Sequence, residues 1–169
     1  MHHDNRTMFN ALLYIAQSGS LWRELPAYYP SWKSVYTKFR CWRDSGPLND
    51  LFLALNDDPD LENLMIDSTI VPAHQHSVGS KKGPNSQIGQ SWDGKATKIH
   101  TLVDALGNPL YFLLTGGQYH DGPQAFKLLE NVTLQSVNVI GDRAYNAAGL
   151  RQYIRTRGGS YTISPRTNY

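Results

Sequence analysis

The sequence predicts an α+β protein, in which a short helical region precedes an α/β domain built on a mixed five-stranded sheet. Two short, apolar, β-branched runs at residues 64–71 and 137–142 indicate buried strands rather than helices. Helical periodicity dominates the first 58 residues, and strands alternate with helices only after them. We therefore predict a helical region over residues 1–58 and a sheet-containing domain over residues 59–169.

Composition and charge exclude several classes of protein. The chain has 169 residues and a single cysteine, Cys41, so an internal disulfide framework and a cysteine-rich zinc site are both excluded. No apolar run approaches the ~20 residues that span a membrane, and the N-terminus lacks a signal-peptide pattern. A cytoplasmic protein without a membrane partner is therefore expected.

Three short helices are predicted in the N-terminal region. The first spans residues 8–17, the second follows an N-cap at Ser31, and the third spans residues 48–55. Short helices with a tight break at residues 45–47 are typical of a helix-turn-helix unit, in which one helix enters a DNA groove. A small bundle that only supports the next domain is the alternative. The acidic, turn-rich residues 56–60 are expected to link the two domains.

Basic residues gather in two parts of the chain, and such clusters suit a phosphate backbone. In the second predicted helix they are Lys33, Lys38, Arg40 and Arg43, with aromatic residues between them. After Asp142 every charged residue is an arginine. A solvated charged surface is the alternative interpretation of either cluster. We predict that the first cluster binds double-stranded DNA.

A long polar loop follows the first strand of the second domain. Residues 72–94 contain many Gly, Ser, Gln and Lys residues, and a long loop in a compact domain is usually functional or disordered. Lys81 and Lys82 suggest an arm that contacts DNA. His74 and His76 lie two residues apart, so they form half of a metal site or are simply polar loop residues.

The remaining elements alternate between strands and helices. Residues 97–104 and 109–115 are rich in β-branched and aromatic residues and flank a Leu-Gly-Asn turn, which predicts an antiparallel hairpin. The later elements are a helix from an N-cap at Asp121 to about residue 131, the strand that ends at Asp142, a helix over about residues 147–157 and a strand over residues 161–163. The resulting order, β, β, β, α, β, α, β, is that of a ribonuclease-H-like fold up to the point where its next helix begins.

In that fold the first and fourth strands are neighbours, so Asp67 and Asp142 meet although 75 residues separate them. A carboxylate in a buried strand needs compensation, and two adjacent carboxylates repel each other unless a cation joins them. Mg²⁺ is a hard, oxygen-seeking ion, and a pair of such ions about 3.5–4 Å apart promotes phosphodiester displacement. The alternative is that each aspartate only caps or turns its strand.

Several short blocks of this sequence occur together, and in the same order, in one known family. The blocks are Leu64-Met65-Ile66-Asp67-Ser68-Thr69, Thr97-Lys98-Ile99-His100-Thr101-Leu102-Val103-Asp104, Thr115-Gly116-Gly117-Gln118-Tyr119-His120-Asp121 and Val139-Ile140-Gly141-Asp142-Arg143-Ala144-Tyr145, with tryptophan-rich segments at residues 21–26 and 32–36. They resemble the DDE transposases, in particular the fifth insertion-sequence family of bacteria. The tryptophan-rich segments resemble the DNA-binding region of that group.

The resemblance implies a function in DNA transposition. Asp67 and Asp142 match the first and second catalytic aspartates, which would bind Mg²⁺ (or Mn²⁺) directly. The chemistry implied is cleavage at the terminal repeats of a mobile element and joining of the freed 3′-OH to target DNA. Such a protein would act in the cytoplasm on the nucleoid, as a homo-oligomer on paired element ends. Lys98, His100, His120 and Asp121 match family blocks. Lys98 and His120 are predicted to contact DNA, with the orientation of an aspartate as the alternative for His120, and Asp121 is expected to cap its helix.

The sequence also departs from the family pattern. The third catalytic carboxylate of the family is a glutamate on the helix after the last predicted strand, and this sequence stops before that helix. Glu62 and Glu130 do not take its place, because they lie before the first strand and before the fourth. Without that helix, one face of the sheet is expected to expose apolar surface.

Three functions therefore remain open at this stage. The first is a transposase, or transposase fragment, that cuts and joins DNA in a metal-dependent reaction. The second is a catalytically inactive DNA-binding truncation product that competes with the full transposase. The third is a different metal-dependent nuclease, in which His74 and His76 complete the metal site.

Overall fold

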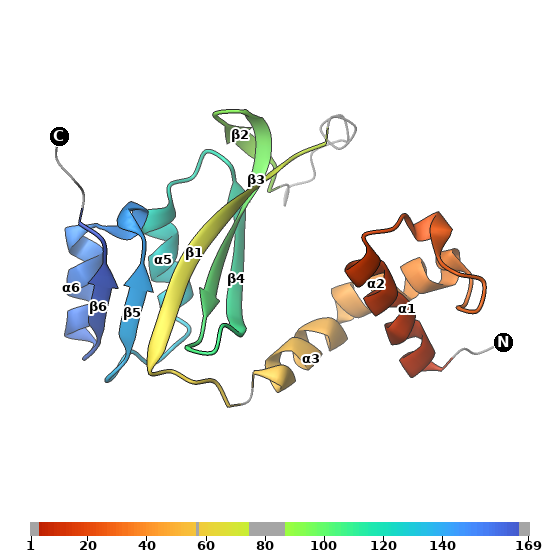
Figure 1. Ribbon diagram of the computed structural model, residues 1–169, viewed down its shortest axis with the longest axis horizontal. Coiled ribbons are helices and arrows are strands. Elements are labelled where there is room, and N and C mark those ends of the chain that lie inside the picture. The colour runs from red at the N-terminus through yellow and green to blue at the C-terminus, as the bar shows by residue number, and fades with distance from the viewer. Residues whose placement is uncertain (1–3, 57, 75–86, 166–169) are drawn as a thin grey trace. The chain divides into compact units, whose positions relative to one another are not determined.

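The structure is a computed structural model that describes residues 4–56, 58–74 and 87–165. The chain forms two compact units, Met1–Leu55 and Asn56–Tyr169, so the division falls three residues before the predicted boundary after residue 58. Figure 1 shows the elements of both units. Within the described residues, no helix combines the length and apolar character needed to cross a membrane.

The first unit is helical, as predicted. Its described elements are α1 (Asn5–Ser18), the 3-10 helix η1 (Trp22–Glu24), α2 (Trp32–Ser45) and α3 (Pro47–Leu55). The Ser31 side chain accepts a hydrogen bond from the Ser34 amide, which confirms it as the N-cap of α2. Gly19 and Gly46 end α1 and α2 with φ of 64° and 106°, a left-handed conformation that glycine adopts without strain.

A small core holds α1, η1 and α2 together. Met8, Ala11 and Val35 are its buried members. The Trp22 ring packs edge-on against Tyr36, with ring centroids 5.1 Å apart, and lies beside Phe39 as well. Helix α3 has no buried residue and contributes none to this core.

The second unit is a mixed sheet with helices. Its described elements are β1 (Asn63–Pro72), β2 (Gly89–Ser91), β3 (Gly94–Val103), β4 (Pro109–Gly116), α5 (Asp121–Leu129), β5 (Asn138–Gly141), the 3-10 helix η2 (Arg143–Tyr145), α6 (Ala148–Thr156) and β6 (Ser160–Ile163). The strand order is β2-β3-β1-β5-β6, and β4 also pairs with β3. Strand β1 is antiparallel to β3 and parallel to β5, and β5 is parallel to β6.

The predicted five-stranded sheet has a sixth strand. Strand β2 lies inside the segment predicted to be a loop, and it pairs with the start of β3. Its three residues are polar or lack a side chain, so they carry no apolar pattern that would reveal a strand. A Cβ on Gly89 would lie only 2.7 Å from the Cα of Gly116, so glycine permits β2 and β4 to approach closely here. Lys81, Lys82 and His76 lie outside the described residues.

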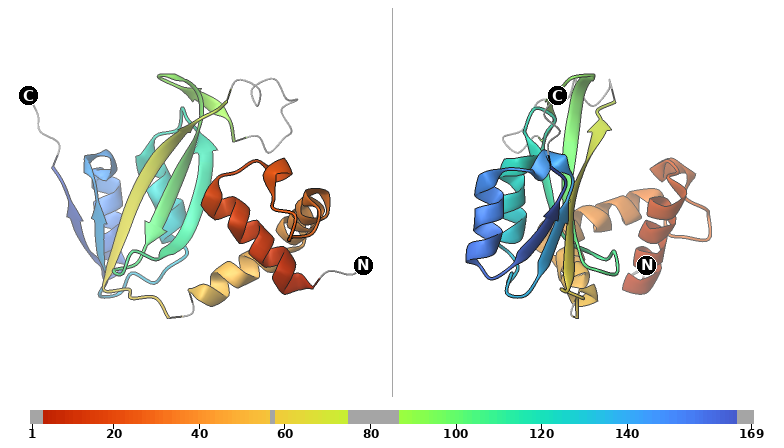
Figure 2. Two further views of the ribbon diagram at one scale, coloured as in Figure 1. Left: turned by 45° about the vertical axis from the view of Figure 1, so that its right-hand side comes forward. Right: turned by 60° about the vertical axis from the view of Figure 1, so that its left-hand side comes forward.

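Helices α5 and α6 cover one face of the sheet (Figure 2). Because strand side chains alternate between faces, every second residue of β1 and β3 points to these helices. The buried apolar core of this unit is formed by Leu64, Ile66, Leu102, Leu110, Ala125, Leu128, Leu129, Leu134, Val137, Val139, Tyr145, Leu150 and Ile154.

The opposite face of the sheet carries no helix among the described residues of this unit. Val71, Phe112 and Leu114 are 46%, 53% and 47% exposed. Phe112 aligns with Thr101 of β3, which in turn aligns with Asp67 of β1, so these apolar residues share the face of Asp67. The predicted exposed apolar surface on one side of the sheet is therefore confirmed.

The connection between β3 and β4 is organised by Asp104, which is 1% exposed. Its Oδ1 accepts hydrogen bonds from the amides of Leu106 and Asn108, and its Oδ2 accepts one from the Asn108 side chain. Burial on its own would raise the pKa of Asp104, but the hydrogen bonds from Asn108, Asp60 and Leu106 outweigh it and lower the pKa.

A pH-dependent contribution to folding stability follows from Asp104. A carboxyl whose pKa is lower in the folded state stabilises the fold above its unfolded pKa, near 3.9, and loses this effect as pH falls through its folded pKa. We expect Asp104→Asn to lose less stability than the wild type below pH ~4. The slope of its unfolding free energy against pH should be smaller by up to the contribution of about one bound proton. Urea unfolding between pH 5 and pH 2.5 measures this slope, and an unchanged slope in the variant would contradict the assignment.

Candidate active site

The structure places Asp67 on β1 and Asp142 directly after the end of the neighbouring strand β5. In the parallel pairing of β1 with β5, Ile66 is opposite Gly141. Asp67 and Asp142 each directly follow one of these two partners, which form the last pair of the register. Neighbouring strands lie about 4.8 Å apart, so the two carboxylates begin from backbones in direct contact.

Both aspartates are exposed, and this corrects the expectation that Asp67 is buried in its strand. Ile66 and Ser68 point to the helices, so Asp67 points to the open face. Each carboxylate is held by one backbone amide. Ser68 N donates to Asp67 Oδ1 at 2.7 Å, and Ala144 N donates to Asp142 Oδ1 at 2.9 Å. In both aspartates the backbone therefore orients Oδ1, and Oδ2 is left to bind a ligand.

The turn after Asp142 is packed tightly against β5. Tyr145, the last residue of η2, is 1% exposed, and its ring lies under Gly141. A Cβ at Gly141 would lie 3.3 Å from Tyr145 Cδ2, so a larger residue before Asp142 would push on this ring. Burial raises the pKa of the Tyr145 hydroxyl, and the nearby carboxylates of Asp121, Asp67 and Asp142 add to that rise.

The donor set suits a hard divalent cation. Mg²⁺ is commonly held by one or two carboxylates, with waters and substrate phosphates as its remaining ligands. Asp67 and Asp142 offer such a pair. Among residues 4–56, 58–74 and 87–165, no group of three or more His, Cys, Asp or Glu side chains is placed to hold a metal ion. A cation here would therefore rely on waters, on phosphate or on a further group for the rest of its shell.

His74 does not join this pair. It follows Asp67 by seven residues, and the pairing of Ala73 N with Lys95 O keeps the chain extended beyond β1. Seven extended residues span about 23 Å, far beyond the reach of one metal ion. The structure therefore does not support a metal site that joins Asp67 to His74.

Lys98 has a different position from the one predicted. It is 8% exposed, on the helix-covered face of β3, and its Nζ forms an ion pair with Asp121 Oδ1 at 3.0 Å. A buried and paired ammonium is not available to a DNA phosphate, so the prediction that Lys98 contacts DNA is corrected. His120 is exposed and is the N-cap residue of α5, whereas Asp121 is the first residue inside the helix. Asp121 therefore does not cap α5 as expected.

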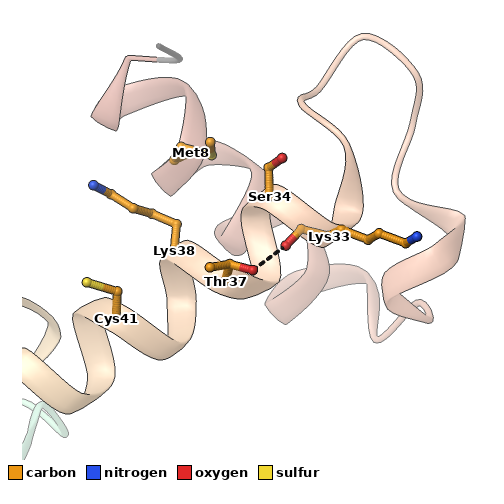
Figure 3. A pocket seen from close by; sticks show the side chains of 6 residues that line it. All are labelled: Met8, Lys33, Ser34, Thr37, Lys38 and Cys41. Carbon is orange, nitrogen blue, oxygen red and sulfur yellow. Dashed lines mark hydrogen bonds between the residues drawn. The ribbon is translucent and has the colours of Figure 1, made fainter. Parts of the chain in front are cut away.

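The basic residues of α2 remain at the surface of the first unit. Lys33 and Lys38 line a shallow groove of about 520 Å³ between α1 and α2, together with Met8, Thr37 and Cys41 (Figure 3). Lys38 Nζ lies 5.1 Å from the centre of the Trp42 ring, so a cation–π interaction with this ring helps to position the ammonium group.

The two arginines of the cluster differ in their surroundings. Arg40 is exposed, with no ion pair among those found in the described residues. Arg43 Nε is paired with Asp44 Oδ1 at 2.7 Å, which offsets its charge. The groove and Arg40 thus form the more positive part of this helix.

Two family descriptions match this chain almost from end to end. A putative transposase of the IS4/5 family matches residues 1–52, and a transposase DDE domain matches residues 58–169. This chain belongs to the insertion-sequence DDE transposases. The match of the second description begins before β1 and includes both aspartates.

Two relatives match parts of this chain. A putative transposase for insertion sequence element IS6501 from Brucella ovis is 49% identical over 59 residues, which are 34% of this transposase and 44% of the relative. An uncharacterized protein of Sinorhizobium fredii, y4sN, is 38% identical over 91 residues, which are 54% of this chain and 73% of the relative.

A solved structure supports the fold. The piggyBac transposase, in a synaptic complex with hairpin DNA, matches 99% of this chain with a TM-score of 0.50 and 13% sequence identity. This transposase spans 43% of that chain. The similarity agrees with the predicted fold class of helices followed by a ribonuclease-H-like sheet.

Sequence reasoning missed two residues beside the aspartates of this transposase. Ser68 and Tyr145 each lie one or a few positions after an aspartate in a family block, but nothing in their spacing indicates a role. Ser68 fixes Asp67 through its amide, and Tyr145 supports the backbone before Asp142. Both roles depend on packing, which a single sequence does not display.

Proposed function

We propose that this chain carries out the DNA-binding and metal-binding steps of transposition at the ends of its insertion element. The observation that supports the proposal is the pairing of β1 with β5, whose last register pair directly precedes two exposed, backbone-oriented carboxylates. The chain spans less than half of the Brucella relative and of the piggyBac chain, so catalysis is proposed for the complete enzyme. Strand cleavage there would free a 3′-OH for joining to target DNA.

Asp67 and Asp142 are proposed as ligands of Mg²⁺ or Mn²⁺. Their negative charges repel each other and also repel a DNA phosphate, so both contacts are costly without a cation. A bound divalent ion would supply the positive charge that stabilises the phosphate and polarises the attacking oxygen. The chain contributes geometry, because the amides of Ser68 and Ala144 keep one oxygen of each carboxylate fixed.

The metal proposal is tested by titrating the wild-type chain with Mn²⁺ and following free Mn²⁺ by electron paramagnetic resonance. We expect saturable binding that Mg²⁺ displaces. Asp93→Asn removes an exposed carboxylate from the turn between β2 and β3, and this control should bind Mn²⁺ as the wild type does. Absence of saturable binding to the wild type would overturn the proposal.

Double-stranded DNA is proposed as the partner of α2 in the first unit. The support is a groove lined by Lys33 and Lys38 beside the exposed Arg40, in a region that matches the IS4/5 transposase description. Phosphate contacts release counterions, so binding through these residues must weaken as salt rises.

Alanine at both Lys38 and Arg40 should weaken DNA binding and flatten its salt dependence. The slope of log K against log salt is expected to fall by roughly one for each phosphate that the protein no longer neutralises. Fluorescence anisotropy with a labelled duplex at several salt concentrations measures both effects. Lys127→Ala removes one exposed charge from α5 and serves as the control. If the slope of log K against log salt is the same in the double variant and the wild type, Lys38 and Arg40 do not bind DNA phosphates and α2 has only a structural role.

A further inference from the structure

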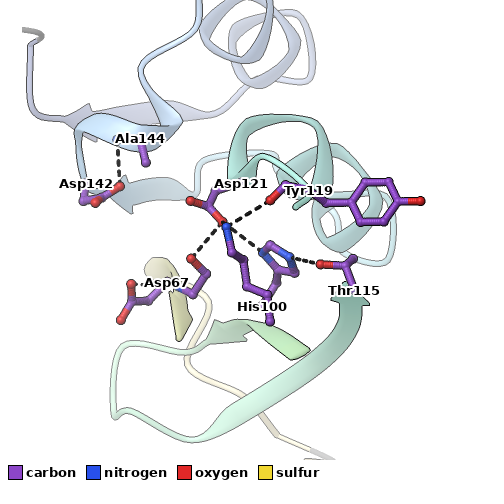
Figure 4. A network of polar contacts seen from close by, with 9 residues as sticks. Asp67, His100, Thr115, Tyr119, Asp121, Asp142 and Ala144 are labelled. Atoms are coloured by element: carbon purple, nitrogen blue, oxygen red, sulfur yellow. Dashed lines mark hydrogen bonds and ion pairs between the residues drawn. The ribbon is translucent and has the colours of Figure 1, made fainter. Parts of the chain in front are cut away.

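A buried polar network lies directly behind the proposed metal site. Asp121 Oδ1, at the start of α5, receives the Lys98 ammonium at 3.0 Å and the Ser68 hydroxyl at 2.9 Å. His100 Nδ1 lies 3.6 Å from the same oxygen. Lys98 and His100 belong to β3 and Ser68 belongs to β1. Figure 4 labels Asp121 and His100 within this network.

The members of this network are also tied to other elements. Lys98 Nζ donates to the carbonyl of Tyr119 at 2.9 Å, and His100 Nε2 lies 2.9 Å from Thr115 Oγ1. The network therefore joins β1, β3, the end of β4 and the start of α5. Most of its surface is enclosed, since His100 is 0% exposed and the Lys98 and Asp121 side chains are 10% and 19% exposed.

Burying this charge pair is difficult to explain by stability alone. Removing charges from water is costly, and a buried ion pair is often no more stabilising than apolar side chains of the same size. Such pairs can instead select one arrangement of the surrounding elements. This pair joins α5 to β3, and the Ser68 hydroxyl joins the same Asp121 oxygen to β1.

Ser68 connects this arrangement to Asp67. Its hydroxyl bonds to Asp121 on the helix-covered face, and its amide donates to Asp67 Oδ1 at 2.7 Å. Any shift of Ser68 would therefore move the amide that orients the Asp67 carboxylate. Lys98 and Asp121 balance each other's charge, so they can fix Ser68 without adding a net charge behind the site.

We propose that Ser68, Asp121 and Lys98 are positioning residues, which hold Asp67 opposite Asp142 so that both bind one divalent cation. This inference rests on the proposed metal-binding function. None of the three is a metal ligand. Outer partners that orient a metal ligand typically contribute about 10–100-fold to metal affinity, which sets the expected size of the effect.

The test compares three variants by Mn²⁺ titration. Ser68→Ala removes the hydroxyl and should weaken Mn²⁺ binding by about tenfold or more. Ser68→Thr keeps a hydroxyl, suits a strand, and should stay within about threefold of the wild type. Thr69→Ala removes a hydroxyl from the next residue, on the open face, and should bind Mn²⁺ normally.

A second variant guards against misfolding. Lys98→Met combined with Asp121→Asn removes both charges together, so neither is left buried alone. With a cooperative thermal transition retained, this double variant should also weaken Mn²⁺ binding by about tenfold. Near-wild-type affinity in a folded Ser68→Ala protein and in this double variant would overturn the positioning role.

The outcomes separate this inference from the proposed function. If Asp67→Asn loses Mn²⁺ binding while Ser68→Ala keeps it, the metal site stands and the network is only structural. If the wild type does not bind Mn²⁺, the proposed function and the inference both fail. Loss of affinity in Ser68→Ala with rescue in Ser68→Thr supports both.

Discussion

Replacing Asp67 with asparagine is expected to weaken Mn²⁺ binding by at least about 100-fold, because a direct ligand should contribute no less than the outer partners of a metal site. Asparagine keeps the size of the side chain and one oxygen but loses the negative charge. DNA binding by the first unit should stay within about twofold of wild type, because the basic residues of α2 belong to a separate unit.

Two measurements on the same preparation check this prediction, namely Mn²⁺ titration and fluorescence anisotropy with a labelled duplex. Asp93→Asn, which removes an exposed carboxylate from the turn between β2 and β3, is the matched control for both. An equal loss of metal and DNA binding would contradict the separation of the two functions.

Leu102→Ala is expected to destabilise the second unit by about 2–5 kcal/mol, because it leaves a cavity in the centre of the core. Leu102 is 0% exposed and lies on β3 between Ile66 of β1 and Tyr111 of β4. A loss of this size is a large fraction of the stability of a typical domain. The first unit has its own core and should be unaffected.

Urea unfolding followed by circular dichroism measures this change. Leu106→Ala is the matched control, because Leu106 is 74% exposed in the turn between β3 and β4. Its unfolding midpoint should stay close to that of the wild type. A Leu102→Ala protein as stable as this control would contradict the described core.

The proximity of the strands that lead to Asp67 and Asp142 could be predicted, because it follows from the order of the strands and helices. A meander followed by alternating helices and strands leaves few ways to pair parallel strands, and β1 and β5 are neighbours as expected. The expected burial of Asp67 was wrong, since an apolar run does not tell which face of the sheet a helix covers. The face became clear only from the positions of α5 and α6 (Figure 2).

The contacts around the site could not be predicted from the sequence. Because lysine is seldom buried, the sequence predicts that Lys98 lies at the surface. Its buried position is explained by the ion pair with Asp121, which the sequence does not reveal. Asp121 resembles an N-cap in the sequence, yet the cap position falls on His120. Strand β2 escaped prediction because backbone pairing with β3, and not an apolar pattern, defines it.

The most direct test of the central claim is paramagnetic broadening of amide resonances by Mn²⁺ in the wild-type chain. The amides of Ser68 and Ala144 donate to the two carboxylates and so report the position of a bound ion from both strands. We predict that substoichiometric Mn²⁺ broadens these two resonances first and together, with amides near His74 unaffected. Broadening at only one of the two amides, or first at His74, would contradict a shared metal site between β1 and β5.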